Sequence, residues 1–129
     1  MKKNLLLIIL IIVVISTFMF LRSKNSKQSN VSIDIYGPVK EFTINGSSFK
    51  YDPSTISVNK GDEVRITFKN IDGNHNLIID GYEVSSKILS SGREDTFEFI
   101  ADKLGNFQFY CSLPGHKTQG MVGTLIVKI

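Results

Sequence analysis

The chain has 129 residues, enough for one domain with its own hydrophobic core but too few for two ordinary domains. Its net charge of +3 comes from the N-terminus, because residues 1–30 carry five basic side chains and no acidic one, whereas the rest carries 10 Lys and Arg against 12 Asp and Glu. Since nucleic-acid binding needs clustered basic residues, this distribution argues against nucleic acid as a partner. The single cysteine, Cys111, excludes an intramolecular disulfide.

The first element is an apolar segment at residues 5–21, interrupted only by Ser16 and Thr17 and flanked by cations on both sides. A helix of this length spans about 25 Å, the short end of what crosses a bilayer. No small-residue cleavage motif follows Thr17, which favours an uncleaved anchor over a cleaved signal peptide. We therefore predict a transmembrane or signal helix at residues 1–22, and a secreted protein if it is cleaved.

A polar stretch separates this segment from the rest of the chain. Residues 23–30 contain no apolar side chain, which is typical of a flexible spacer. We divide the chain accordingly into the helix, a linker at residues 23–38 and a folded domain at residues 39–129.

The folded part shows the alternation of β-strands. Apolar and polar side chains alternate in residues 64–69, 96–99, 106–109 and 125–129. Turns rich in Gly, Asn and Asp separate these stretches at intervals of about 8 to 12 residues. Residues 80–92 fit least well, and we expect there a loop with a short helical turn. The pattern predicts an all-β domain, a sandwich or a barrel.

Three types of soft metal ligand lie within eleven residues near the end of the chain: Cys111, His116 and Met121. A thiolate, an imidazole and a thioether at this spacing are typical of a mononuclear redox copper site. The other histidine, His75, is then the fourth candidate ligand. Zinc rarely takes methionine, and structural zinc sites prefer more than one thiolate, so copper fits better.

Strand parity explains how distant ligands could meet. In a strand that ends near Cys111, this thiol shares the apolar face with Phe107 and Phe109 and points inward. His75 would enter the same interior from a strand that begins after the turn at residues 72–74. Taken singly, a buried Cys or Met is more often core packing and a lone His a surface or core residue. For these explanations to hold jointly, it would have to be a coincidence that all four residues fall at the spacing of copper ligands.

These residues resemble the cupredoxins, the type 1 blue-copper proteins that include plastocyanin, azurin and rusticyanin. The specific part is Tyr-Cys-Ser-Leu-Pro-Gly-His at 110–116 followed by Gly-Met-Val-Gly at 120–123, with a ligand spacing closer to azurin and rusticyanin. His75 and Asn76 are similar to the family's first ligand and its neighbour. The resemblance covers about residues 39–129 and implies a Greek-key β-sandwich, one type 1 copper ion and outer-sphere electron transfer.

The resemblance also implies roles for residues around the ligands. Asn76 would tie its loop to the ligand loop, and a backbone amide near Ser112 or Leu113 would donate to the sulfur of Cys111. The docking patch for a redox partner would consist of Leu113, Pro114 and His116.

We therefore expect a membrane-tethered copper protein that carries single electrons between redox partners, such as a terminal oxidase or a cytochrome. We place it on the extracytoplasmic side, in the periplasm or at the cell surface, because a thiolate copper site suits an exported protein, and we expect a monomer. A copper-binding or delivery protein without electron transfer is the main alternative. An enzyme is disfavoured, because a binuclear copper site needs a second cysteine and multicopper enzymes need more histidines. A domain without metal is the remaining alternative.

Overall fold

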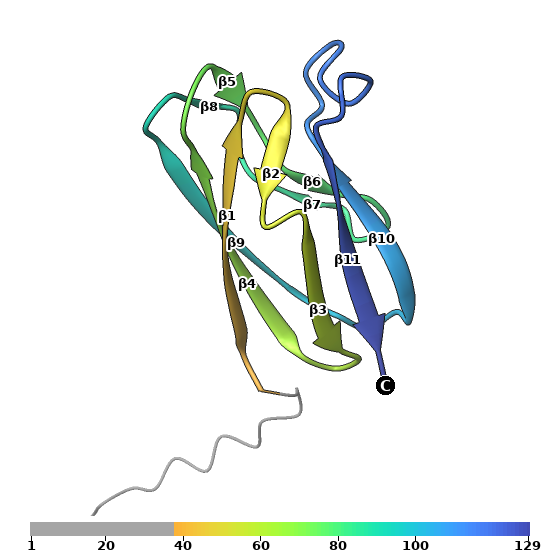
Figure 1. The fold of residues 1–129 in the computed structure, drawn as a ribbon. Coiled ribbons are helices and arrows are strands. Elements are labelled where there is room, and N and C mark those ends of the chain that lie inside the picture. The colour runs from red at the N-terminus through yellow and green to blue at the C-terminus, as the bar shows by residue number, and fades with distance from the viewer. Residues whose placement is uncertain (1–37) are drawn as a thin grey trace, which may run out of the picture. The chain divides into compact units, whose positions relative to one another are not determined.

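The computed structural model describes residues 38–129, which form eleven β-strands and no helix (Figure 1). The strands are β1 (Lys40–Ser47), β2 (Lys50–Asp52), β3 (Thr55–Asn59), β4 (Glu63–Asn70), β5 (Asn74–His75), β6 (Ile78–Ile79), β7 (Val84–Ser85), β8 (Leu89–Ser90), β9 (Glu94–Ile100), β10 (Gly105–Tyr110) and β11 (Val122–Lys128). Within this part of the chain, nothing helical is long and apolar enough to cross a membrane. The helix predicted at residues 1–22 and nearly all of the linker lie outside the described residues.

The strands form two large sheets that pack face to face (Figure 1). One sheet has the order β2-β1-β4-β9 and the other the order β3-β11-β10-β6-β7, while β5 and β8 form a separate pair. β1 runs parallel to β4 and β3 runs parallel to β11, whereas the other neighbours are antiparallel. Strands far apart in the sequence therefore lie side by side, and the predicted all-β sandwich is confirmed.

The alternation read from the sequence places the core correctly. In β4, Val64, Ile66 and Phe68 are fully buried, and they belong to one apolar cluster with side chains from both sheets. The intervening Arg65 faces outward, where it forms ion pairs with Glu41 on one neighbouring strand and Glu98 on the other. One face of the sheet is thus dry and the other wet, as a period of two requires.

The helical turn expected within residues 80–92 is not present. A turn at residues 80–83 leads into β7 instead, and the segment continues to β8. Gly81 and Glu83 adopt φ angles of 81° and 52°, which a right-handed helix does not allow. The buried Ser86 hydroxyl accepts from the Leu77 amide at 2.9 Å, which ties the segment to the sheet.

Two glycines allow large side chains to pack below the ligand loop. Gly123 of β11 lies opposite Phe109 of β10, and a Cβ added there would lie 2.1 Å from the phenyl ring. A Cβ on Gly46 of β1 would lie 2.6 Å from the ring of Phe68 and 3.3 Å from Cε of Met121. This end of the sandwich is therefore closely packed, and Met121 is part of that packing.

Candidate metal centre

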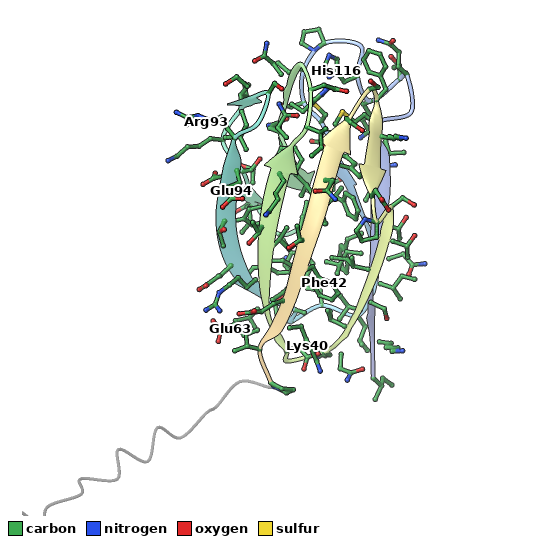
Figure 2. All side chains as sticks on the ribbon, turned by 60° about the vertical axis from the view of Figure 1, so that its left-hand side comes forward. Lys40, Phe42, Glu63, Arg93, Glu94 and His116 are labelled. Carbon is green, nitrogen blue, oxygen red and sulfur yellow. The ribbon has the colours of Figure 1, made fainter. Side chains whose placement is uncertain are left out.

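Three donor atoms from two separate segments lie within 4.8 Å of one another, from His75, Cys111 and His116. The Nδ1 atoms of the two histidines are 3.1 Å apart, and Sγ of Cys111 lies 3.4 Å from Nδ1 of His116 and 4.0 Å from Nδ1 of His75. Cys111 and His75 are buried, whereas His116 is partly exposed. Figure 2 places His116 at one end of the sandwich, away from Lys40 and Glu63 at the other.

This triangle has the size that a metal ion needs. A point equidistant from the three atoms lies about 2.1 Å from each, within the range of roughly 2.0 to 2.3 Å for metal–nitrogen and metal–sulfur bonds in proteins. Two imidazoles and one thiolate in a trigonal set are typical of blue-copper sites. The donors present therefore fit copper in both chemistry and spacing.

Met121 is fully buried directly below the ligand loop. Its amide donates to the carbonyl of His116 at 3.0 Å, and its carbonyl accepts from the amide of Cys111 at 3.3 Å. Gly120, at a φ of 99°, makes the bend that precedes it. The backbone of Met121 is thus bonded to two of the other candidate ligands, which places this residue next to them in the fold.

The segment around His75 differs from the continuous strand expected after the turn at residues 72–74. β5 contains only Asn74 and His75 and pairs with β8, and the chain joins the larger sheet only at β6. Asn76 is buried between these two strands, and its side chain turns toward the ligand loop instead of a neighbouring strand. His75 still enters the interior, as its parity predicts.

Asn76 connects the two ligand segments through Ser112. Its Oδ1 accepts from the Ser112 amide at 2.9 Å, and its Nδ2 donates to the Ser112 hydroxyl oxygen at 3.0 Å. Because the Ser112 amide is used in this way, a donor to the sulfur of Cys111 remains a prediction for the amide of Leu113 alone. Leu113 itself is half-buried and packs against the core cluster.

The surroundings of His75 favour its uncharged form. Burial lowers the pKa of His75, the positive charge of protonated His116 lowers it further, and Asp72 opposes the shift only in part. His75 is therefore held as the neutral imidazole that can bind a metal. Burial also raises the pKa of Tyr51, with a smaller contribution from Cys111, and the Tyr51 hydroxyl donates to the carbonyl of Asn76.

Three further residues lie at the centre that the sequence analysis did not identify, Ser48, Phe49 and Asp72. The ring of Phe49 stands edge-on to that of His116, with centroids 5.0 Å apart, and edge-on to that of His75 at 6.5 Å. Asp72 lies beside Nε2 of His75 and is bound by Ser48. The one available signal was the position of Asp72 in the turn three residues before His75, which by itself indicates only a turn.

A comparison with known protein families supports this site and covers nearly the whole chain. The family described as "Cupredoxin-like domain" matches residues 8–127. The chain belongs to the cupredoxin family. Copper is the cofactor of this family, and His75, Cys111, His116 and Met121 are positioned as a type 1 copper site.

Two individual relatives support this assignment. The protein named plastocyanin minor isoform, chloroplastic, of Arabidopsis thaliana is 34% identical over 93 residues, which cover 63% of this chain and 52% of that protein. The copper-resistant cuproprotein CopI of Rubrivivax gelatinosus is 26% identical over 101 residues, which cover 63% of this chain and 61% of that protein. The matched region thus spans about half to three fifths of these curated relatives.

A solved structure shows the same fold. Dithionite-reduced auracyanin from Roseiflexus castenholzii superposes with a TM-score of 0.65 at 23% identity, covering 72% of this chain and all of that one. The cupredoxin fold of residues 38–129 is therefore supported by both sequence and structure.

Proposed function

We propose that this cupredoxin carries single electrons between redox proteins as a membrane-tethered, extracytoplasmic type 1 copper protein without catalytic activity of its own. The observation that carries the proposal is the triangle of His75, Cys111 and His116 donor atoms, which two separate segments of the sandwich bring together. The chain is similar to a plastocyanin and to auracyanin A of Chloroflexus aurantiacus, which is described as a "blue" copper protein.

The residues of this chain supply geometry and access. Copper bound to the donors supplies a one-electron couple. β5 and the end of β10 hold His75 and Cys111 inside the sandwich, while Asn76 ties their two segments together. These contacts would hold the ligands in place in either oxidation state of a bound copper ion, which would limit the rearrangement that accompanies electron transfer. His116 is the partly exposed ligand and offers the shortest route to a partner.

The colour of the copper protein tests the proposal. Adding Cu(II) to the full chain in detergent should give an intense blue thiolate-to-copper band, because Cys111 is the single thiolate donor. The Cys111→Ala variant should lose this band while it retains the fold, whereas Ser91→Ala, a small substitution at an exposed turn, should keep it. A wild-type complex that binds copper but stays colourless would contradict a type 1 site.

The tether and the location form a second part of the proposal. The support comes from the sequence alone: an apolar segment at residues 5–21 with cations on both sides, and a thiolate site that suits an exported protein. Fractionation of cells that express the full chain should recover it with membranes, and external protease should digest the copper domain in intact spheroplasts. Recovery in the soluble cytoplasmic fraction would contradict both statements.

For docking we propose the surface formed by Leu113, Pro114 and His116, to which the exposed side chain of Phe49 adds. These four residues line one shallow pocket with parts of residues 72–75. An apolar rim around an exposed ligand edge suits a transient redox partner, such as an oxidase or a cytochrome, and leaves the carrier a monomer. Pro114→Glu should slow electron exchange with such a partner and leave the blue band unchanged. If the variant and the wild type exchanged electrons at the same rate, the partner would not dock on this surface.

The second candidate is a copper-binding or delivery protein, favoured by the similarity to CopI, a protein named for copper resistance. Thiolate, imidazole and thioether donors also suit Cu(I). Repeated reduction and oxidation separate the two functions. An electron carrier should keep its copper through many cycles, whereas a delivery protein should release it to an acceptor after reduction.

A further inference from the structure

We propose that Asp72, held in place by Ser48, is a positioning residue for the His75 ligand and shifts the site's preference toward Cu(II). The inference rests on the proposed copper site and concerns a carboxylate to which neither the sequence pattern nor the ligand set assigns a role. It is carried by a chain of contacts that begins at the β1–β2 turn and ends at the donor atom of His75.

Ser48 binds both oxygens of the Asp72 carboxylate. The Ser48 amide donates to Oδ1 at 2.9 Å and its hydroxyl donates to Oδ2 at 3.0 Å. These two bonds orient a side chain that is otherwise half exposed, and they lower the pKa of Asp72, so the carboxylate is ionised at neutral pH. Ser48 has a positive φ of 31°, the backbone conformation with which its amide makes this bond.

The carboxylate then faces the outer nitrogen of His75. Nε2 of His75 lies 3.5 Å from Oδ1 of Asp72, while Nδ1 of the same ring faces Cys111 and His116. The imidazole is only 4% exposed, so water does little to satisfy Nε2. An acceptor on the Nε2 side favours the tautomer that carries its proton there and leaves the Nδ1 lone pair for the metal.

The charge of Asp72 has a second consequence. A carboxylate beside an imidazole ligand raises the donor strength of the ring, and its negative charge stabilises Cu(II) more than Cu(I). Loss of that charge should therefore weaken Cu(II) binding about 10-fold to 100-fold, the range found for such outer partners, and weaken Cu(I) binding less. The ratio of the two affinities should therefore change in favour of Cu(I), and the reduction potential of the bound copper should rise.

The experiment compares the wild-type full chain with Asp72→Asn, Ser48→Ala and Asp62→Asn. Asp62→Asn is the matched control, because Asp62 also accepts from a backbone amide in a turn but lies at the far end of the sandwich. Competition with chelators measures Cu(II) and Cu(I) affinity separately. Nitrogen-15 NMR of the metal-free chain reports which ring nitrogen of His75 carries the proton.

Asp72→Asn should lower Cu(II) affinity more than Cu(I) affinity and weaken the preference for the Nε2–H tautomer. Ser48→Ala should cause the same two changes to a smaller extent, since the hydrogen bond from the backbone amide of residue 48 to Asp72 remains. This variant provides the test if Asp72→Asn folds poorly. An unchanged affinity ratio and tautomer in both variants, or the same change in Asp62→Asn, would overturn the proposal. If instead the proposed function were wrong, the wild type itself would lack a blue copper site that can be reduced and reoxidised, so the two failures can be told apart.

Discussion

Two turns at opposite ends of the sandwich follow different rules. The β3–β4 turn, residues 59–62, is built as local chemistry predicts: Gly61 takes a φ of 95°, and the buried Asp62 accepts from the amide of Asn59 at 2.9 Å. A Cβ added at Gly61 would meet nothing within 4 Å. The glycine is therefore needed for its backbone conformation alone.

The β1–β2 turn has no glycine at the corresponding positions. Ser48 and Phe49 take φ angles of 31° and 65°, and positive φ is a strained conformation for a residue as large as phenylalanine. Their side chains bind Asp72 and pack against His116. The turn at the metal end is therefore locally less stable but makes contacts with the site, whereas the turn at the far end serves the fold alone.

The largest effect should come from the link between the ligand segments. Asn76→Ala removes a buried side chain and leaves the amide and hydroxyl of Ser112 without their partner, which should lower the free energy of unfolding by about 3 kcal/mol. Urea denaturation of the metal-free chain measures this loss, and the blue band should shift with it. Asn74→Ala, an exposed change in the same segment, should do neither; equal losses would show that the bridge contributes little.

At the far end, Asp62→Ala should cost stability without touching the metal centre. The Asn59 amide loses its acceptor, so we expect a loss of about 2 kcal/mol in the same denaturation experiment. The absorption spectrum of the copper form should stay that of the wild type. A changed spectrum would mean that the two ends are coupled; the exposed Asp102→Ala serves as the control for charge.

The glycine of the same turn should have a smaller effect. Gly61→Ala forces a Cβ into a positive φ with no clash, so the loss should be about 1–2 kcal/mol. Gly61→Asn should lose less than alanine, because asparagine tolerates this conformation better. Thermal unfolding distinguishes the two, and equal stability of all three proteins would contradict the assignment of strain to this backbone.

The smallest effect on stability should come from Phe49, where the effect on copper should be large. Phe49→Asn removes ring contacts with the histidines but relieves the strained φ, so stability should change by no more than about 1 kcal/mol. Copper transfer to a chelator should become several-fold faster because the cover over His116 is lost. Phe49→Leu, which keeps an apolar cover, should release copper more slowly than asparagine; equal release rates would show that no cover exists.

The strands and the inward direction of the ligands could be predicted because both follow from alternation. β4 and β11 have one buried and one wet face, and Cys111 continues the buried face of β10. The short strands β5 and β6 could not be separated, since Asn76 leaves the sheet for a partner 36 residues away. No local pattern announces a contact of this kind.

The contacts of the β1–β2 turn were out of reach for the same reason. Ser48 and Asp72 are 24 residues apart, and only the parallel pairing of β1 with β4 brings their strand ends together. Local rules would even place Gly or Asn at Phe49. Sequence reasoning therefore fails at the point where the chain departs from its own local preferences.

The pairing of β11 has a consequence for how the protein is made. β11 lies between β3 and β10, and it follows Met121 directly in the sequence. During synthesis, both neighbours wait with unpaired edges until this strand emerges, and the loop that carries three ligands can close only when β11 has docked. A nascent or truncated chain that lacks β11 should therefore be unable to retain copper.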